Sequence, residues 1–196
     1  MKNRYLIPAL MAALLLPTVA SAQFSDSFNF IKAVKDADGA KATEFLNKPG
    51  TVIVNTRDAA TGQTGLHIVT ARRDATWLGF LLQRGASPDV RDNNGKTALM
   101  IATELRWTDG IQVLLARRAS VDVANGNGET PLAKAVINND IASVRLLLAA
   151  NANPNRADNA GFSPKDLARR DPRLSGVLKE LDAAKPAPKR EVQGPR

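Results

Sequence analysis

The stretch TGLHIVTARRD, residues 64–74, returns twice in altered form, as TALMIATELRW at residues 97–107 and as TPLAKAVINND at residues 130–140. The interval is 33 residues in both cases, and a glycine stands two residues before each stretch. After each stretch comes a second similar segment: FLLQRGASPDV, VLLARRASVDV and LLLAANANPNR, which start at residues 80, 113 and 146, align without a gap. A period of this length predicts a solenoid, in which each unit packs on its neighbours.

Each unit is predicted to hold two short helices. The first helix starts after Thr64, Thr97, Thr130 or Ser163, whose side-chain oxygens suit an N-cap. Proline follows the last two of these residues, at the position where a helix does not need its N–H. In the three units that begin with threonine, an apolar residue follows three positions after a leucine, which in the first of these units is Leu66. This spacing predicts one buried face on the first helix.

The second helix carries a leucine-rich face and ends at a turn that requires a positive φ. Gly85 supplies that conformation freely and Asn151 tolerates it, while Arg118 stands at the same position in the unit between them. Trp77 and Gly110 are also equivalent, one unit apart. We expect the indole of Trp77 to fill the space that Gly110 leaves.

These residues resemble the ankyrin repeat, whose signature includes T-P-L-H-x-A at a 33-residue period. No single unit carries the full signature, because Gly65 and Ala98 replace the proline, and Met100, Ala133 and Asp166 replace the histidine. The resemblance implies an all-α ankyrin-repeat solenoid of stacked helix-turn-helix units with hairpin loops.

The resemblance extends towards both ends of the chain. The segment from Phe30 looks like a divergent first repeat whose extra residues fall in loops, and the segment from Gly161 looks like a terminal cap. We expect a signal peptide at 1–22, an ankyrin-repeat domain at 23–184 and a disordered tail at 185–196. Within that domain we expect the divergent repeat at 27–61, repeats at 62–94, 95–127 and 128–160, and the cap at 161–184.

The first residues have the pattern of a cleavable signal peptide. A positive start, MKNR, precedes an apolar run, and Ala20 and Ala22 form the small-x-small pattern of a signal peptidase site. The alternative is a membrane anchor, but the run is short beside the roughly 20 apolar residues of a spanning helix. We therefore expect cleavage after Ala22, a mature chain without a stable membrane span, and a periplasmic or secreted bacterial protein.

The composition argues against an enzyme. The chain has no cysteine and one histidine, His67, so neither a thiolate nucleophile nor a Cys- or His-rich metal site is available. No nucleotide-binding loop or nucleophile elbow is found. The resemblance implies that His67 hydrogen-bonds near its helix start and ties neighbouring loops together. We expect no catalytic, cofactor-binding or metal-binding residues.

The resemblance implies a binding module that presents a concave surface to a protein partner, whose identity the sequence leaves open. The concave positions are Gln63, Arg72, Arg73, Asn93, Asn94, Lys96, Glu104, Leu105, Trp107, Asn127, Glu129, Ile137 and Asn138. Two interpretations stand for Leu105, Trp107 and Ile137: they form an exposed apolar centre, or they pack against the adjacent loop.

Charge supports an alternative function. Removal of Lys2 and Arg4 lowers the formal net charge from +8 to +6, and arginine pairs recur in the units. The chain is thus also a candidate binder of anionic envelope surfaces or polymers, although solubility alone accounts for a solvated basic face. Nucleic acid is not an expected partner of an exported chain, and we expect a monomer.

Overall fold

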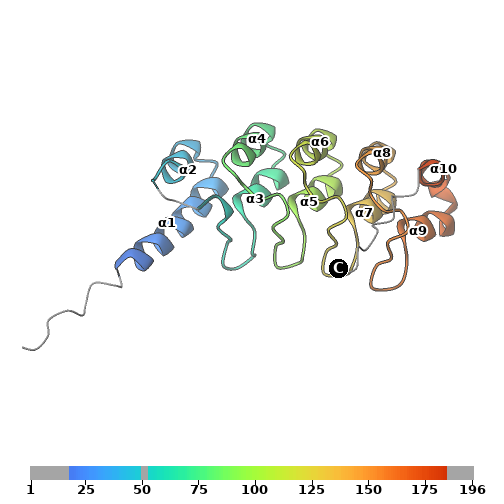
Figure 1. Ribbon diagram of the computed structural model, residues 1–196, viewed down its shortest axis with the longest axis horizontal. Helices are drawn as coiled ribbons and strands as arrows, with labels where there is room; N and C mark the ends of the chain where they lie inside the picture. The colour runs from blue at the N-terminus through green and yellow to red at the C-terminus, as the bar shows by residue number, and fades with distance from the viewer. Residues whose placement is uncertain (1–17, 50–52, 185–196) are drawn as a thin grey trace, which may run out of the picture.

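The computed structural model describes residues 18–49 and 53–184, with side chains from residue 26 onward. Within these residues, ten α-helices follow one another in five pairs (Figure 1). The first helices of the pairs, called the inner helices, are α1 (Thr18–Lys35), α3 (Gly65–Ala71), α5 (Ala98–Glu104), α7 (Pro131–Ile137) and α9 (Pro164–Arg170). The outer helices are α2 (Gly39–Leu46), α4 (Ala75–Gln83), α6 (Thr108–Ala116), α8 (Ile141–Ala149) and α10 (Ser175–Ala183).

The pairs stand side by side and form an elongated stack. Figure 1 shows α4, α6 and α8 in one row and α3, α5 and α7 in a second row, with long loops projecting beyond the second row. Short 3₁₀ turns, η1 (Ile53–Asn55) and η2 (Pro172–Leu174), complete the described elements. The predicted all-α solenoid of helix pairs and hairpin loops is confirmed.

Local side-chain chemistry sets where the helices begin. Thr97 Oγ1 accepts the backbone N–H of Met100, and Thr130 Oγ1 accepts that of Ala133, so both threonines act as N-caps as predicted. The outer helices begin differently, because aspartates such as Asp74 cap three of them.

The turns after the helices adopt the conformation that the sequence predicts. Gly85, Arg118 and Asn151 have φ values of 87°, 62° and 65° after the outer helices. A second set of left-handed residues follows the inner helices, and it includes Arg73 and Arg106. The turns after α3, α5 and α7 thus reverse the chain within three residues and bring the outer helix back onto the core, whereas the turns after the outer helices lead into the hairpin loops.

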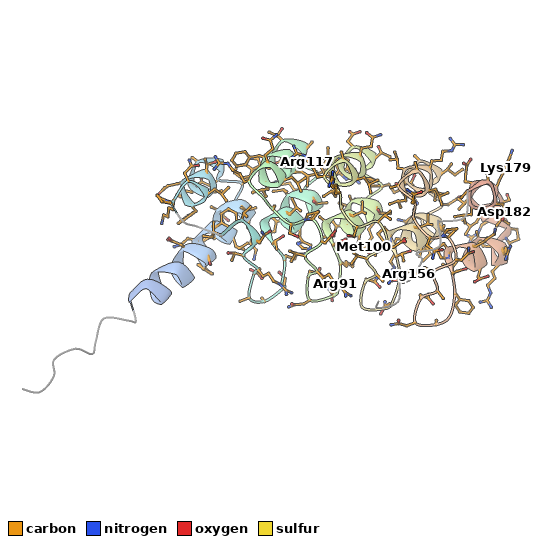
Figure 2. All side chains as sticks on the ribbon, in the orientation of Figure 1. Arg91, Met100, Arg117, Arg156, Lys179 and Asp182 are labelled. Carbon is orange, nitrogen blue, oxygen red and sulfur yellow. The ribbon has the colours of Figure 1, made fainter. Side chains whose placement is uncertain are left out.

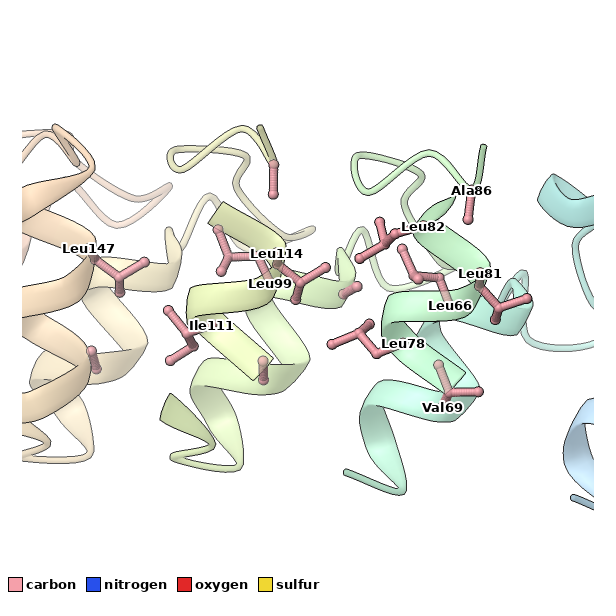
Figure 3. Close-up of a cluster of buried hydrophobic side chains, with 14 of the residues drawn as sticks. Leu66, Val69, Leu78, Leu81, Leu82, Ala86, Leu99, Ile111, Leu114 and Leu147 are labelled. Atoms are coloured by element: carbon pink, nitrogen blue, oxygen red, sulfur yellow. The ribbon is translucent and has the colours of Figure 1, made fainter. Parts of the chain in front are cut away.

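The core runs through the stack without interruption. Leu66, Leu99, Leu132 and their neighbours on the outer helices are fully or almost fully buried, as the periodicity predicts. Figure 3 shows such side chains from successive units lining up between the two rows of helices. Because each unit packs only on the next, the free energy of unfolding depends mainly on these neighbour interfaces.

The hairpin loops span 56–64, 89–97, 122–130 and 155–163, and we number them first to fourth. They contain no β-strand, and the single β-bridge in the described chain joins Arg57 to Thr64. In the second loop, Asp92 Oδ1 accepts the backbone N–H groups of Asn94 (2.9 Å) and Lys96 (2.8 Å). Adjacent loops are hydrogen-bonded through their backbones, for example from Gly126 N to Asn94 O at 2.9 Å.

The prediction for Trp77 is wrong. A β-carbon at Gly39 would lie 2.9 Å from Cζ2 of Trp77, so the indole packs on the preceding helix pair and not towards Gly110. The space above Gly110 is occupied by Trp107 of the same unit. Equivalent positions in a repeat share a backbone environment, but the direction in which a side chain leans is not fixed by the period.

The two ends of the stack differ. At the C-terminal end, α10 covers α8 and α9 and is joined to them by the ion pairs Arg145–Glu180 and Lys165–Asp182. At the other end, α1 starts at Thr18, so the described helix includes the predicted cleavage site at Ala22. Residues 1–17 and 185–196 lie outside the described residues. No helix in the described part of the chain has the length and apolar character to span a membrane.

Candidate partner-binding surface

The last residues of the inner helices form a row along the stack. This inner-helix row consists of Lys35, Ala71, Glu104, Ile137 and Arg170, and from Ala71 onward its members are 33 residues apart. Because α3, α5, α7 and α9 contact one another in sequence, the row crosses the unit boundaries in order. Lys35 and Arg170 were not predicted as site residues, although the same period points to Arg170.

Most members of the row are paired with a hairpin loop of their own or the next unit. Lys96 Nζ lies 2.7 Å from Glu104 Oε2, and the guanidinium of Arg170 lies 3.9 Å from the ring centroid of Phe162. Lys96 and Phe162 are themselves equivalent residues, 66 positions apart. One geometry therefore holds an ion pair in one unit and a cation–π contact in another.

At the N-terminal end of the row, Lys35 Nζ lies 2.6 Å from Asp58 Oδ2. The hydrogen bond from Lys35, with further ones from the backbone and side chain of Thr61, lowers the pKa of Asp58 far below its usual range. This pair fixes the first hairpin loop against α1.

Ile137, like the small Ala71, makes no such side-chain pair with a hairpin loop of the described chain. Glu129 is the hairpin residue equivalent to Lys96 and Phe162. It pairs with Lys134 at 2.7 Å and not with the residue at the end of α7. The side chain of Ile137 is 50% exposed, and Ile137 and Phe28 are the two exposed large apolar residues in the described part of the chain. An exposed isoleucine between the units of Glu104 and Arg170 is an apolar position with charged residues on both sides.

The other two predicted apolar residues are more covered. Leu105 is half-buried at the end of α5, and its carbonyl accepts a hydrogen bond from Arg73 Nη2 at 2.6 Å. Trp107 is half-buried against Gly110 and the core. Of the three predicted apolar residues, Ile137 alone is exposed.

The predicted polar residues take part mainly in contacts between units. Arg72 Nη1 donates to the carbonyl of Val34 at 2.8 Å, and its Nη2 pairs with Asp74. The carbonyl of Asn138 accepts a hydrogen bond from Arg106. Asn127 is exposed at the tip of the third hairpin loop. Arg72, Arg73 and Asn138 thus stabilise the stack whether or not a partner also contacts them.

His67 is part of the scaffold, as the resemblance implies. Its Nδ1 accepts the backbone N–H of Thr64 at 3.1 Å, so Nε2 carries the proton and donates to the carbonyl of Lys96 at 3.0 Å. The ring is 1% exposed, and this burial lowers its pKa. In the last unit, Asp166 accepts the backbone N–H of Ser163 in the same way. Within residues 26–49 and 53–184 it makes no hydrogen bond to another hairpin loop.

A groove of about 780 Å³ lies between the hairpin loops and contains residues that the sequence did not single out. Its walls are formed by Arg57, Arg91–Lys96 and Asn125–Asn127. Asn93, Asn94, Lys96 and Asn127 were predicted on the concave surface and belong to it. Arg57 and Arg91 were not, although each directly precedes a hairpin aspartate in the sequence. In the described residues, no three His, Asp or Glu side chains are grouped to hold a metal ion.

Comparison with known families agrees with this architecture. A family model of three ankyrin repeats matches residues 30–125 and 66–158, and these overlapping matches together cover more than half of the chain. The chain therefore belongs to the ankyrin repeat family. Ankyrin repeats are in general protein–protein interaction modules. No curated protein matches the chain.

Proposed function

We propose that this chain is a non-enzymatic module, exported to the periplasm, that binds a protein partner on the inner-helix row. The observation that carries the proposal is the exposure of Ile137 among charged neighbours. An apolar centre with a polar rim is the usual anatomy of a protein interface.

The energetics of the row favour a partner at Ile137. Covering its exposed half would stabilise a complex by about 1 kcal/mol from burial of apolar surface. The neighbouring charges are already held in place by intramolecular contacts, so little side-chain entropy is lost when a partner approaches them. The row therefore resembles a preorganised surface.

The test begins with capture of a partner from a periplasmic fraction, with the purified protein as bait. Ile137→Asp is then compared with Gln112→Asp, which adds the same charge at an exposed position of the outer helix α6. We expect Ile137→Asp to weaken binding by about tenfold or more and Gln112→Asp to leave it unchanged. Thermal melts show whether both variants fold. Binding that survives Ile137→Asp in a folded protein rules out the row as the interface.

Export has its own test. The motif at Ala20–Ala22 supports cleavage that leaves Gln23 as the first residue. Intact-mass measurement on protein from an exporting bacterial host should give the mass of residues 23–196. A mass that still contains residues 1–22 contradicts the proposed export.

A further inference from the structure

Two arginines of neighbouring hairpin loops are held in the same way. Asp58 and Asp92 are equivalent, because the backbone N–H of each closes its loop, onto Gln63 O at 2.7 Å and Lys96 O at 2.8 Å. The residues before them, Arg57 and Arg91, each anchor Nε on the carbonyl of a loop glycine, at 3.0 and 3.2 Å. Anchoring at Nε leaves the terminal nitrogens of both forks available for a ligand, apart from a 3.3 Å contact of Arg57.

The groove between these loops has a positive charge that its own acids do not neutralise. The single carboxylate among its lining residues, Asp92, is 7% exposed and already accepts two backbone N–H groups. The equivalent residue in the third loop is the uncharged Asn125. No ion pair between Arg57 or Arg91 and a carboxylate is found in the described chain.

Amides complete the groove. Asn94 and Asn127 occupy equivalent positions at the tips of the second and third loops, and both are exposed. An asparagine side chain offers one acceptor and two donors, which is the complement of a peptide unit. Two amides one unit apart therefore suit an extended backbone, whereas the arginine forks suit carboxylates.

We infer that this groove binds an acidic, extended peptide segment of the partner, with carboxylates on Arg57 and Arg91 and backbone groups on Asn94 and Asn127. The inference rests on the proposed function and adds to it the chemistry of the partner. A general polyanion would not distinguish these arginines from others, such as Arg117, which lies by the outer helices while Arg91 lies at the hairpin loops (Figure 2).

The experiment measures fluorescence anisotropy of a labelled peptide in which glutamate alternates with glycine. The control peptide has glutamine in place of glutamate. We expect the purified protein to bind the acidic peptide about tenfold more tightly than the control, and the difference to shrink as sodium chloride is added. Equal affinity for the two peptides would overturn the inference.

Matched variants locate the binding. Arg57→Gln with Arg91→Gln is compared with Arg117→Gln and Arg118→Gln, which remove the same charge from exposed positions at the end of α6. We expect the first pair to lower affinity about tenfold and the second about twofold or less. If the first pair impairs folding in thermal melts, Arg57→Lys with Arg91→Lys keeps the charge but lacks the anchored fork, and should still lose about threefold. Equal losses in the two glutamine pairs contradict the assignment.

Inorganic polyphosphate and phosphatidylglycerol vesicles provide the remaining arms. If either binds more tightly than the acidic peptide, and binding falls equally in both glutamine pairs, the basic residues form a diffuse anionic-surface binder and the inference is wrong.

Failure of this inference can be distinguished from failure of the proposed function. A captured partner that requires Ile137 but tolerates Arg57→Gln with Arg91→Gln leaves the proposed function standing and removes the acidic segment.

Discussion

The unit built on α3 and α4 and the unit built on α5 and α6 have helices of the same lengths but reach stability by different side chains. Three equivalent positions differ in character: His67 against Met100, Trp77 against Gly110, and Gly85 against Arg118. In the first unit, His67 forms a hydrogen-bonded bridge to the next hairpin loop, Trp77 packs on the preceding helix pair, and the turn at Gly85 is free of strain. In the second unit, Met100 is buried without such a bridge, Trp107 packs on its own helix, and the turn holds the strained Arg118.

The two units differ in side-chain contacts that can be exchanged, but they share the features that specify the backbone of a repeat. Both units share a threonine at the N-cap position of the inner helix, the buried leucines and the positive φ after the outer helix, so these features specify the backbone. The bridge from His67 to the next loop is absent at Met100, which is nevertheless fully buried. An interface between units can therefore be held by hydrogen bonds or by apolar packing, provided that one of them is present.

The largest expected effect comes from removal of the bridge. His67→Ala loses the bonds to Thr64 N–H and Lys96 O and leaves a buried cavity, so we expect it to lower the free energy of unfolding by about 3 kcal/mol. Met100→Leu, which conserves volume and breaks no hydrogen bond, should cost less than about 1.5 kcal/mol. Urea melts measure both. Similar losses in the two variants would show that the bridge adds nothing beyond packing.

The second effect concerns the two indoles. Trp77 is half-buried on Gly39, so Trp77→Ala should cost about 2 kcal/mol, less than a fully buried tryptophan. Gly39→Ala should destabilise the wild type, because its β-carbon would meet the indole, and should be tolerated once Trp77 is alanine. The same cycle with Gly110→Ala should couple to Trp107→Ala. Coupling of Gly110→Ala to Trp77→Ala would instead show that Trp77 packs against Gly110, as the sequence suggested.

The features that the sequence predicted correctly are local ones. The caps at Thr97 and Thr130 and the positive φ at Arg118 each follow from the chemistry of a single turn. The packing of Trp77 could not be obtained in this way. A 33-residue period identifies equivalent residues, but it does not tell whether a side chain faces the preceding or the following unit.

The candidate site was predicted in part for a related reason. Lys96 and Glu104 were both expected on the surface, but their pairing depends on how a hairpin loop folds over its helix. Arg57 and Arg91 are equivalent in space yet 34 residues apart, because the first hairpin loop contains one extra residue. A search at a strict interval of 33 therefore does not align them. Because of this one-residue insertion, the period did not indicate the basic groove.

The third effect is a gain in stability at the turn after α6. Arg118 has φ 62° and is exposed, whereas Gly85 takes the same conformation without a β-carbon. No ion pair involving Arg118 occurs in residues 26–49 and 53–184. We expect Arg118→Gly to raise the free energy of unfolding by about 1 kcal/mol, and Gly85→Arg to lower it by a similar amount. A melting temperature that falls on Arg118→Gly would mean that the arginine makes a stabilising contact.

The smallest expected effect is the pH dependence of the bridge. Burial lowers the pKa of His67 in the folded state, although the nearby charge of Asp92 opposes this and that of Arg57 adds to it. The neutral ring is the form that accepts the N–H of Thr64, so the unfolded state binds the proton first as pH falls. The contribution of His67 is therefore complete above the unfolded pKa of about 6.5 and decreases as pH falls below it towards the folded pKa.

The control variant is His67→Met, which places at this position the residue type found at Met100 in the next unit and has no group that titrates there. Urea melts of the wild type and His67→Met between about pH 7.5 and pH 5 should show the stability of the wild type falling relative to the variant, while carboxylates common to both proteins cancel. A difference that stays constant, or that grows in favour of the wild type at low pH, would mean that Asp92 stabilises a protonated ring and that the bridge does not depend on the neutral form.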